Sequence, residues 1–174
     1  MGDAAGSDKR YAFRINRTGS TIHVFESAID LLSYATIMIS SFDDGFAVRK
    51  RPLISGGGAP PIEMKMRTGN WRAEPMLSLG GVYAQSSNKR GMKTPAALSN
   101  VLENHPEIKT IALHLDNDFA GRNASRAITE NLQDRYIIRD EPPPYGKDCN
   151  AYLMNLRRRE HSKKMGRDRS DHPR

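Results

Sequence analysis

Three acidic residues follow predicted strands in an arrangement that suits metal-dependent chemistry. Glu26 comes directly after the β-branched run Thr21–Phe25, and Asp116 and Asp118 come directly after the apolar run 110–115. Side chains two residues apart share a face of an extended chain, so both aspartates can point the same way. Mg²⁺ accepts carboxylate oxygens together with water and phosphate, which leaves Glu26 to move a proton. These residues predict a Mg²⁺ site for phosphoryl transfer.

The same acidic residues also have a purely structural interpretation. Asp116 and Asp118 precede a predicted helix that begins near Ala120, where either side chain can cap the first turn. Glu26 lies before another helix N-terminus, where negative charge is favourable. Asp30 follows Ser27 at the spacing of a capping box, and capping explains this residue without chemistry. Both interpretations of Glu26, Asp116 and Asp118 stay open at this point.

Further polar residues are predicted near the same edge of the fold. Gly80 and Gly81 follow the second strand, where they either let the backbone approach a phosphate or simply end the strand in a turn. Arg122 is a phosphate-binding candidate or a solvated surface arginine. Lys147 would bring positive charge to this edge, where it could bind phosphate or nucleic acid. Asp148 would add a fourth carboxylate or cap the last helix.

Alternating elements must position these residues. Each of the first three predicted strands is followed by a helix, which favours an α/β fold with a mainly parallel, roughly four-stranded sheet flanked by helices. In such sheets ligands collect at the carboxyl ends of the strands, so the acidic residues should converge there. The predicted strands are 21–25, 76–79, 110–115 and 135–138, and the helices begin at Ser27, Pro95, Ala120 and Asp148.

The length of 174 residues predicts one globular domain. We expect an N-terminal extension or excision boundary over 1–20, a domain over 21–156 with an insertion at about 41–75, and a disordered basic tail over 157–174. That tail supplies +5 of the formal net charge of +7, because it holds eight Lys or Arg against three acids. The basic charge of the whole chain therefore says little about a nucleic-acid surface on the body.

Cysteine content and hydropathy narrow the class of protein. Cys149 is the only cysteine, which excludes an internal disulfide or a Cys₄ zinc site within this chain and favours a cytoplasmic location. No apolar run approaches the roughly 20 residues of a membrane span, so no membrane partner is expected. His114, within an apolar strand, is predicted to be a hydrogen-bonded core residue, and Cys149 a packed thiol.

Four motifs together resemble one known family. The runs F-E-S-A-I-D, L-S-L-G-G and H-L-D-N-D-F-A-G-R-N-A each end a strand, and they resemble the Toprim signature of bacterial-type primases, topoisomerases and related nucleases. The run G-K-D-C-N at 146–150 follows a proline-rich turn, as in Toprim-like domains of primase-like proteins from plasmids, conjugative elements and phages. The resemblance covers about 22–153 and implies a Rossmann-like Toprim fold.

The resemblance implies residue roles and a reaction. Glu26 would act as general acid/base or auxiliary metal ligand, Asp116 and Asp118 would bind Mg²⁺ or Mn²⁺, and the reaction would be nucleotidyl transfer on DNA or RNA. The chain carries no P-loop of the G-x-x-x-x-G-K-[ST] kind, so flanking domains of a larger primase-like protein are expected partners.

Three other functions remain open on the sequence. The first is a Toprim nuclease. The second is a non-catalytic module that binds nucleic acid through the basic tail with Arg49, Lys50 and Arg51. The third is an assembly domain that docks through the 41–75 insertion.

Overall fold

The computed structural model describes residues 8, 10–43, 71–80 and 93–168, and within them five strands form one sheet. The sheet has the order β1-β3-β2-β4-β5, in which β1 runs antiparallel to β3 and all other neighbours are parallel. This confirms the predicted α/β fold with a mainly parallel sheet. The strands are β1 (Arg14–Ile15), β2 (Thr21–Phe25), β3 (Met76–Ser78), β4 (Thr110–His114) and β5 (Ile137–Asp140).

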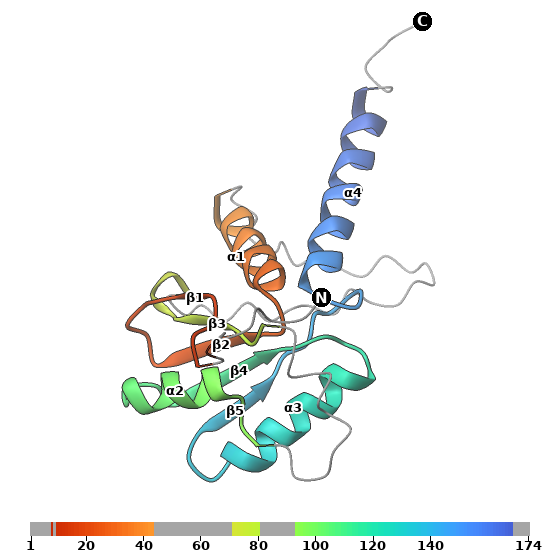
Figure 1. The fold of residues 1–174 in the computed structure, drawn as a ribbon. Coiled ribbons are helices and arrows are strands. Elements are labelled where there is room, and N and C mark those ends of the chain that lie inside the picture. The colour runs from red at the N-terminus through yellow and green to blue at the C-terminus, as the bar shows by residue number, and fades with distance from the viewer. Residues whose placement is uncertain (1–7, 9, 44–70, 81–92, 169–174) are drawn as a thin grey trace, which may run out of the picture.

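Helices cover both faces of the sheet (Figure 1). They are α1 (Ala28–Asp43), α2 (Ala96–Asn104), α3 (Phe119–Leu132) and α4 (Cys149–Asp168), with a 3-10 turn η1 (Trp71–Ala73). On one face, Val24 and Leu113 pack with Leu98 of α2 and Ile128 of α3. On the other face, Phe25 packs with α1 residues and with Cys149 of α4. The central strands β2 and β4 are buried on both sides, which explains their nearly continuous apolar sequence.

The connections of β2 and β4 leave the sheet in opposite directions. These strands are neighbours, with Phe25 paired to His114 at their carboxyl ends. The chain passes from β2 into α1 on one face, and from β4 into α3 on the other. The carboxyl ends of β2 and β4 are therefore a topological switch point, the position where open α/β sheets bind their ligands, and the name crevice is used below for this position.

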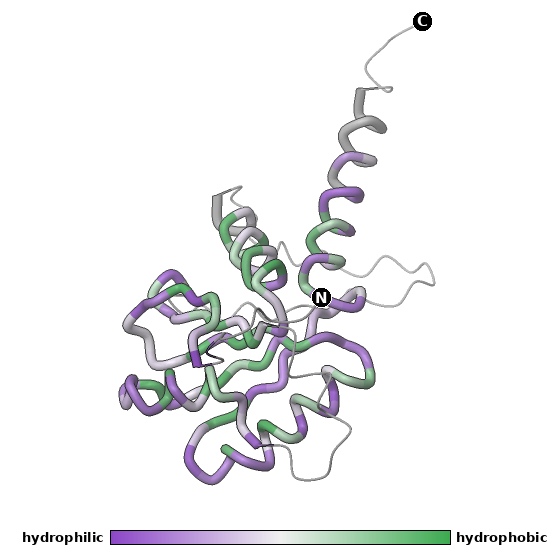
Figure 2. Tube along the Cα trace, in the orientation of Figure 1, coloured by the Kyte–Doolittle hydropathy of each residue, from purple (hydrophilic) through white to green (hydrophobic). Residues whose placement is uncertain are grey.

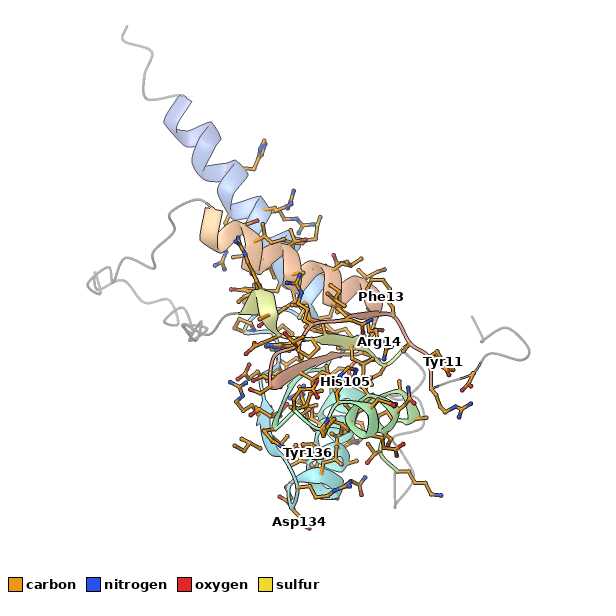
Figure 3. All side chains as sticks on the ribbon, turned by 90° about the vertical axis from the view of Figure 1, so that its left-hand side faces the viewer. Tyr11, Phe13, Arg14, His105, Asp134 and Tyr136 are labelled. Carbon is orange, nitrogen blue, oxygen red and sulfur yellow. The ribbon has the colours of Figure 1, made fainter. Side chains whose placement is uncertain are left out.

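Several boundaries differ from the sequence prediction. Strand β1 was not predicted, because two residues are too short to show a period, and it adds an edge where Phe13 and Arg14 face outward (Figure 3). Strand β5 begins at Ile137, two residues after the predicted start. Pro95 is the N-cap of α2 and not its first helical residue. Within the predicted insertion, 44–70 lie outside the described residues, including Arg49, Lys50 and Arg51.

The predicted disordered tail is largely helical. Helix α4 begins at Cys149 and continues through the first part of the predicted tail, from residue 157 to Asp168. It extends away from the sheet (Figures 1 and 3). Arg, Lys, Glu and Met are good helix formers, which lets the helix continue after its packed first turns. Figure 2 shows its outer turns as hydrophilic where they are coloured, in contrast to the apolar α1 beside it. Among the described helices, none has the length and apolar character needed to cross a membrane.

Candidate functional site

Three predicted site residues meet at the crevice between β2 and β4. Glu26 follows the last residue of β2, and Asp116 lies two residues after the end of β4. The charges of Asp116 and Asp118 both raise the pKa of Glu26, so the three carboxylates lie within electrostatic reach of one another. The structure therefore brings together the three residues that the sequence singled out. Their catalytic and metal-binding roles stay predictions.

Asp118 uses its two carboxylate oxygens differently. Its Oδ1 accepts the backbone N–H of Gly121 at 2.9 Å and so caps helix α3. This backbone hydrogen bond is the main reason why the pKa of Asp118 lies below its usual value. Its Oδ2 lies 3.3 Å from Lys147 Nζ, on the side of the crevice. The capping interpretation is confirmed for Asp118, and one oxygen still faces the site.

Asp116 is buried, with 8% of its surface exposed. Burial raises its pKa, and the ammonium of Lys147, whose Nζ lies 3.1 Å from Asp116 Oδ2, acts in the opposite direction. Lys147 thus contacts both aspartates, and its own pKa is raised by them. The predicted positive charge at this edge is therefore present, paired to the acidic residues.

Glu26 is half-buried, and its pKa is raised to about 7. Burial is the largest cause, followed by repulsion from Asp116 and Asp118, while Lys147 lowers the value. A carboxyl group with this pKa exchanges a proton readily at neutral pH. Its surroundings differ from those of Asp118, whose pKa is lowered, and such divergence within one site is typical of residues with separate acid/base and charge-holding roles.

The donor set fits a hard divalent cation. Carboxylate oxygens are the ligands that Mg²⁺ and Mn²⁺ prefer. The position between Asp116 and Asp118 already attracts a cation, since Lys147 Nζ lies there. In the described part of the chain, no three His, Cys, Asp or Glu side chains are close enough together to coordinate one ion. A metal at this position would therefore use one or two carboxylates, with water and substrate phosphate as further ligands.

The other predicted residues of the site have mixed outcomes. Gly80 has a φ of +78°, so it ends β3 in a conformation that L side chains rarely adopt, and a Cβ there would meet no atom within 4 Å. Gly81 lies outside the described residues. Asp148 caps α4, since its Oδ1 accepts the N–H of Ala151 at 2.6 Å. It also raises the pKa of Asp116, so it belongs to the same acidic region.

Arg122 holds the loop that carries the aspartates. Its Nη1 pairs with both carboxylate oxygens of Asp140, at 2.9 and 2.8 Å. Its Nε and Nη2 donate to the backbone carbonyls of Asp116 and Leu115 at the end of β4. The guanidinium therefore ties β5 to the loop after β4. A contact of Arg122 with phosphate stays a prediction.

Two residues that matter to the site were missed by the sequence analysis. A Cβ on Gly121 would collide with the backbone oxygen of Asp116, so only glycine lets α3 approach the acidic loop this closely. The Asn150 N–H donates to Asp30 Oδ1 at 3.3 Å, which joins the first turns of α1 and α4. Gly121 lies in the run H-L-D-N-D-F-A-G-R-N-A, and Asn150 lies in the run G-K-D-C-N. Their position in these motifs was the sequence signal that could have identified them.

Asp30 and the two buried residues behave as the sequence predicted. Ser27 Oγ accepts the backbone N–H of Asp30 at 3.2 Å, so the predicted capping box is present with Ser27 as its cap, and Asp30 Oδ1 accepts the Asn150 N–H. His114 is 3% exposed and hydrogen-bonded, and Cys149 is 2% exposed. Burial raises the pKa of the Cys149 thiol, which disfavours the nucleophilic thiolate.

Comparison with known proteins gives one family match. The model of a family described as Toprim-like matches residues 23–153. No curated protein matches the chain. Among solved structures, the crystal structure of the primase fragment of the bacteriophage T7 primase-helicase protein is similar at 19% sequence identity, with a TM-score of 0.43. That match covers 86% of this chain, which spans 45% of the T7 fragment.

Proposed function

The chain belongs to the Toprim-like family, and we propose that it is the catalytic domain of a primase-like protein that performs metal-dependent nucleotidyl transfer on nucleic acid. The observation that carries this proposal is the meeting of Glu26, Asp116 and Asp118 at one crevice, with the pKa of Glu26 raised to about 7. The motif at 146–150 supports a primase-like protein of a plasmid, conjugative element or phage, acting in DNA replication in the cytoplasm.

The side chains of the crevice divide the reaction between them. Asp116 and Asp118 would hold Mg²⁺ or Mn²⁺, which neutralises the phosphates of a nucleotide when bound. Glu26 takes the proton of an attacking 3′-hydroxyl, while the hydroxyl oxygen bonds to the α-phosphorus and pyrophosphate leaves. Because its pKa is about 7, Glu26 returns that proton to water at neutral pH. The backbone of Gly80 and Gly81 would approach a phosphate at the neighbouring strand end.

Partners follow from this reaction. The substrates would be nucleotides together with a DNA or RNA strand, and flanking domains of a larger protein would supply unwinding. A nuclease remains the nearest alternative, in which water replaces the hydroxyl as nucleophile at the same residues. A non-catalytic nucleic-acid-binding module is the second alternative, and the exposed Arg157 and Arg158 on α4 favour it.

The deciding experiment measures metal binding by calorimetry. Mn²⁺ and Mg²⁺ are titrated into the wild-type protein and into an Asp116→Asn/Asp118→Asn double variant, with folding checked by circular dichroism. Asparagine keeps a capping oxygen for α3, so loss of binding reports on the carboxylates and not on the helix. We expect saturable binding that is lost in the variant, and primer synthesis or cleavage that depends on the same ions. Absence of binding to wild type, even with nucleotide present, would refute the catalytic proposal.

A further inference from the structure

Lys147 has a position in the crevice that the proposed reaction does not explain. Its Nζ lies 3.1 Å from Asp116 Oδ2 and 3.3 Å from Asp118 Oδ2, so one ammonium is shared by the two carboxylates. We propose that Lys147 is a tethered counter-cation, which neutralises the acidic site in the metal-free protein and must be displaced by an incoming divalent ion. This inference rests on the proposed function and assigns Lys147 the role of setting metal affinity.

The backbone of Lys147 is fixed to the acidic loop itself. Its carbonyl oxygen accepts the backbone N–H of Asn117, which stands between the two aspartates, at 2.6 Å. Gly146 before it has a φ of +89°, and Asp148 after it caps α4. The main chain on both sides is therefore held in a defined turn. The ammonium is delivered to the aspartates by a short, well-anchored connection.

The side chain, in contrast, is free to leave. It is 59% exposed to solvent, and the only ion pairs described for it are those with Asp116 and Asp118. Rotation about its flexible stem would carry the ammonium into water without disturbing the turn. A divalent ion and the ammonium group of Lys147 cannot both occupy the space between Asp116 Oδ2 and Asp118 Oδ2. Metal binding must therefore break the two ion pairs, and their free energy is subtracted from the metal affinity.

The displaced ammonium would stay close to the metal, because its backbone cannot move away. It would then meet the phosphates of a nucleotide that the metal also contacts, as a point charge with three donors. Lys147 would become available to phosphate only after the metal has entered. The predicted phosphate role of Lys147 and its observed pairing with the aspartates are thus two states of one side chain.

The test compares Lys147→Met with Lys109→Met, which removes the same charge at the opposite end of β4. Lys109 donates to the carbonyl of Pro106 and has no part in the crevice. Mn²⁺ affinity is measured by calorimetry and by the electron paramagnetic resonance signal of free Mn²⁺. We expect Lys147→Met to bind Mn²⁺ roughly three- to tenfold more tightly than wild type, the range set by exposed ion pairs. Lys109→Met should match wild type.

Thermal denaturation provides a second readout that needs no activity. Without metal, Lys147→Met should melt below Lys109→Met, because Glu26, Asp116 and Asp118 then repel one another without compensation. Saturating Mn²⁺ should remove the difference in melting temperature between the two variants. Equal or weaker Mn²⁺ binding by Lys147→Met, with wild-type binding intact, would overturn the counter-cation role alone. If neither wild type nor the variant binds Mn²⁺, the proposed function fails together with this inference.

Discussion

At the scale of single residues, the environment of Glu26 separates it from the other acids of the crevice. Asp118 is stabilised as an anion by the Gly121 N–H, which lowers its pKa, whereas Glu26 is half-buried and faces two like charges. The same crevice thus contains one carboxylate that stays charged and one carboxyl that exchanges its proton near neutrality. This division is the physical basis for assigning proton transfer to Glu26.

The raised pKa of Glu26 can be measured directly. In metal-free protein, carbon-13 NMR of the Glu26 carboxyl should give a midpoint of about 7, and Asp116→Asn should lower it by removing a like charge. Asp148→Asn is the matched control, since Asp148 is not among the main charges that act on Glu26. A wild-type midpoint near the ordinary value of 4.5 would contradict the assignment.

The raised pKa of Glu26 also makes its contribution to the free energy of unfolding depend on pH. The folded pKa lies above the unfolded value of 4.5, so the folded state binds the proton more tightly. The contribution of Glu26 to stability is therefore fully present below about pH 4.5 and is lost as pH rises through about 7. Glu26→Gln should remove the loss of stability that occurs as pH rises.

We expect that only glycine at position 121 allows α3 to pack closely against the backbone of Asp116. In Gly121→Ala the new Cβ would collide with the Asp116 carbonyl oxygen, so the helix or the loop must shift. We expect a loss of about 1–3 kcal/mol in the free energy of unfolding, the usual cost of overpacking, and weaker Mn²⁺ binding. Urea denaturation and calorimetry measure the two effects. Asn123→Ala in the same helix should change neither, and a fully stable Gly121→Ala would show that the close approach is dispensable.

At the scale of elements, a buried chain of hydrogen bonds joins the two central strands to their surroundings. His23 of β2 and His114 of β4 share a hydrogen bond of 2.8 Å between Nδ1 and Nε2. His114 Nδ1 donates to the carbonyl of Glu141 at 2.9 Å, and in neutral His114 the Nε2 therefore accepts from His23 Nδ1. His23 Nε2 meets Glu74 Oε2 at 2.6 Å. The ring of Tyr34 packs over both imidazoles.

Burial favours the neutral form of His114, which makes the fold sensitive to acid. Burial and the neighbouring His23 hold the pKa of His114 well below its usual value of 6.5. A depressed folded pKa means that the unfolded chain binds the proton more tightly, so stability is full above about pH 6.5 and falls as pH is lowered. The groups that face this imidazole are His23, Glu141, Arg139 and Tyr34.

Thermal denaturation between about pH 7.5 and 5 tests this expectation. The melting temperature of wild type should fall over this interval, and His114→Asn should be less stable at pH 7.5 but show a smaller fall. His105→Gln changes a partly exposed histidine that follows the last residue of α2 and should behave like wild type. If His114→Asn retains the full wild-type dependence on pH, another group is responsible.

At the scale of the whole molecule, α4 carries positive charge away from the sheet. Arg157 and Arg158 are exposed on it, and Arg159 lies over the ring of Tyr145, 5.4 Å from its centroid. The Tyr145 contact ties α4 to the turn that leads to Lys147 at the crevice. A strand of nucleic acid bound along α4 would therefore be guided toward the acidic site.

Fluorescence anisotropy with a single-stranded oligonucleotide tests the role of α4. Arg157→Gln/Arg158→Gln should weaken binding and lower the slope of log affinity against log salt by about one to two, the number of phosphate contacts removed. Arg126→Gln/Arg135→Gln removes the same charge from α3 and the end of the following turn, and should leave the slope unchanged. Equal losses in both variants would assign binding to overall charge and not to α4.

The sequence by itself determined the fold class and the acidic residues. Parallel strands buried on both faces are continuously apolar, so β2, β3 and β4 can be recognised in the sequence as apolar runs. The residues that follow these parallel strands must lie at the same edge of the sheet. That reasoning located Glu26, Asp116 and Asp118 without coordinates. It also predicted the caps made by Ser27 and Asp148, because capping depends on neighbours three residues away.

Only the tertiary structure decided which distant groups pair. Lys147 lies between Asp116 and Asp118, Arg122 binds Asp140, and His23 meets His114, although none of these pairs has a sequence spacing that signals contact. Such pairs depend on the path of loops and on side-chain reach, which hydrophobic periodicity does not encode. The extent of α4 was missed for a related reason. A charged segment is compatible with disorder or with a solvated helix, and the packing of its first turns against α1 decides between them.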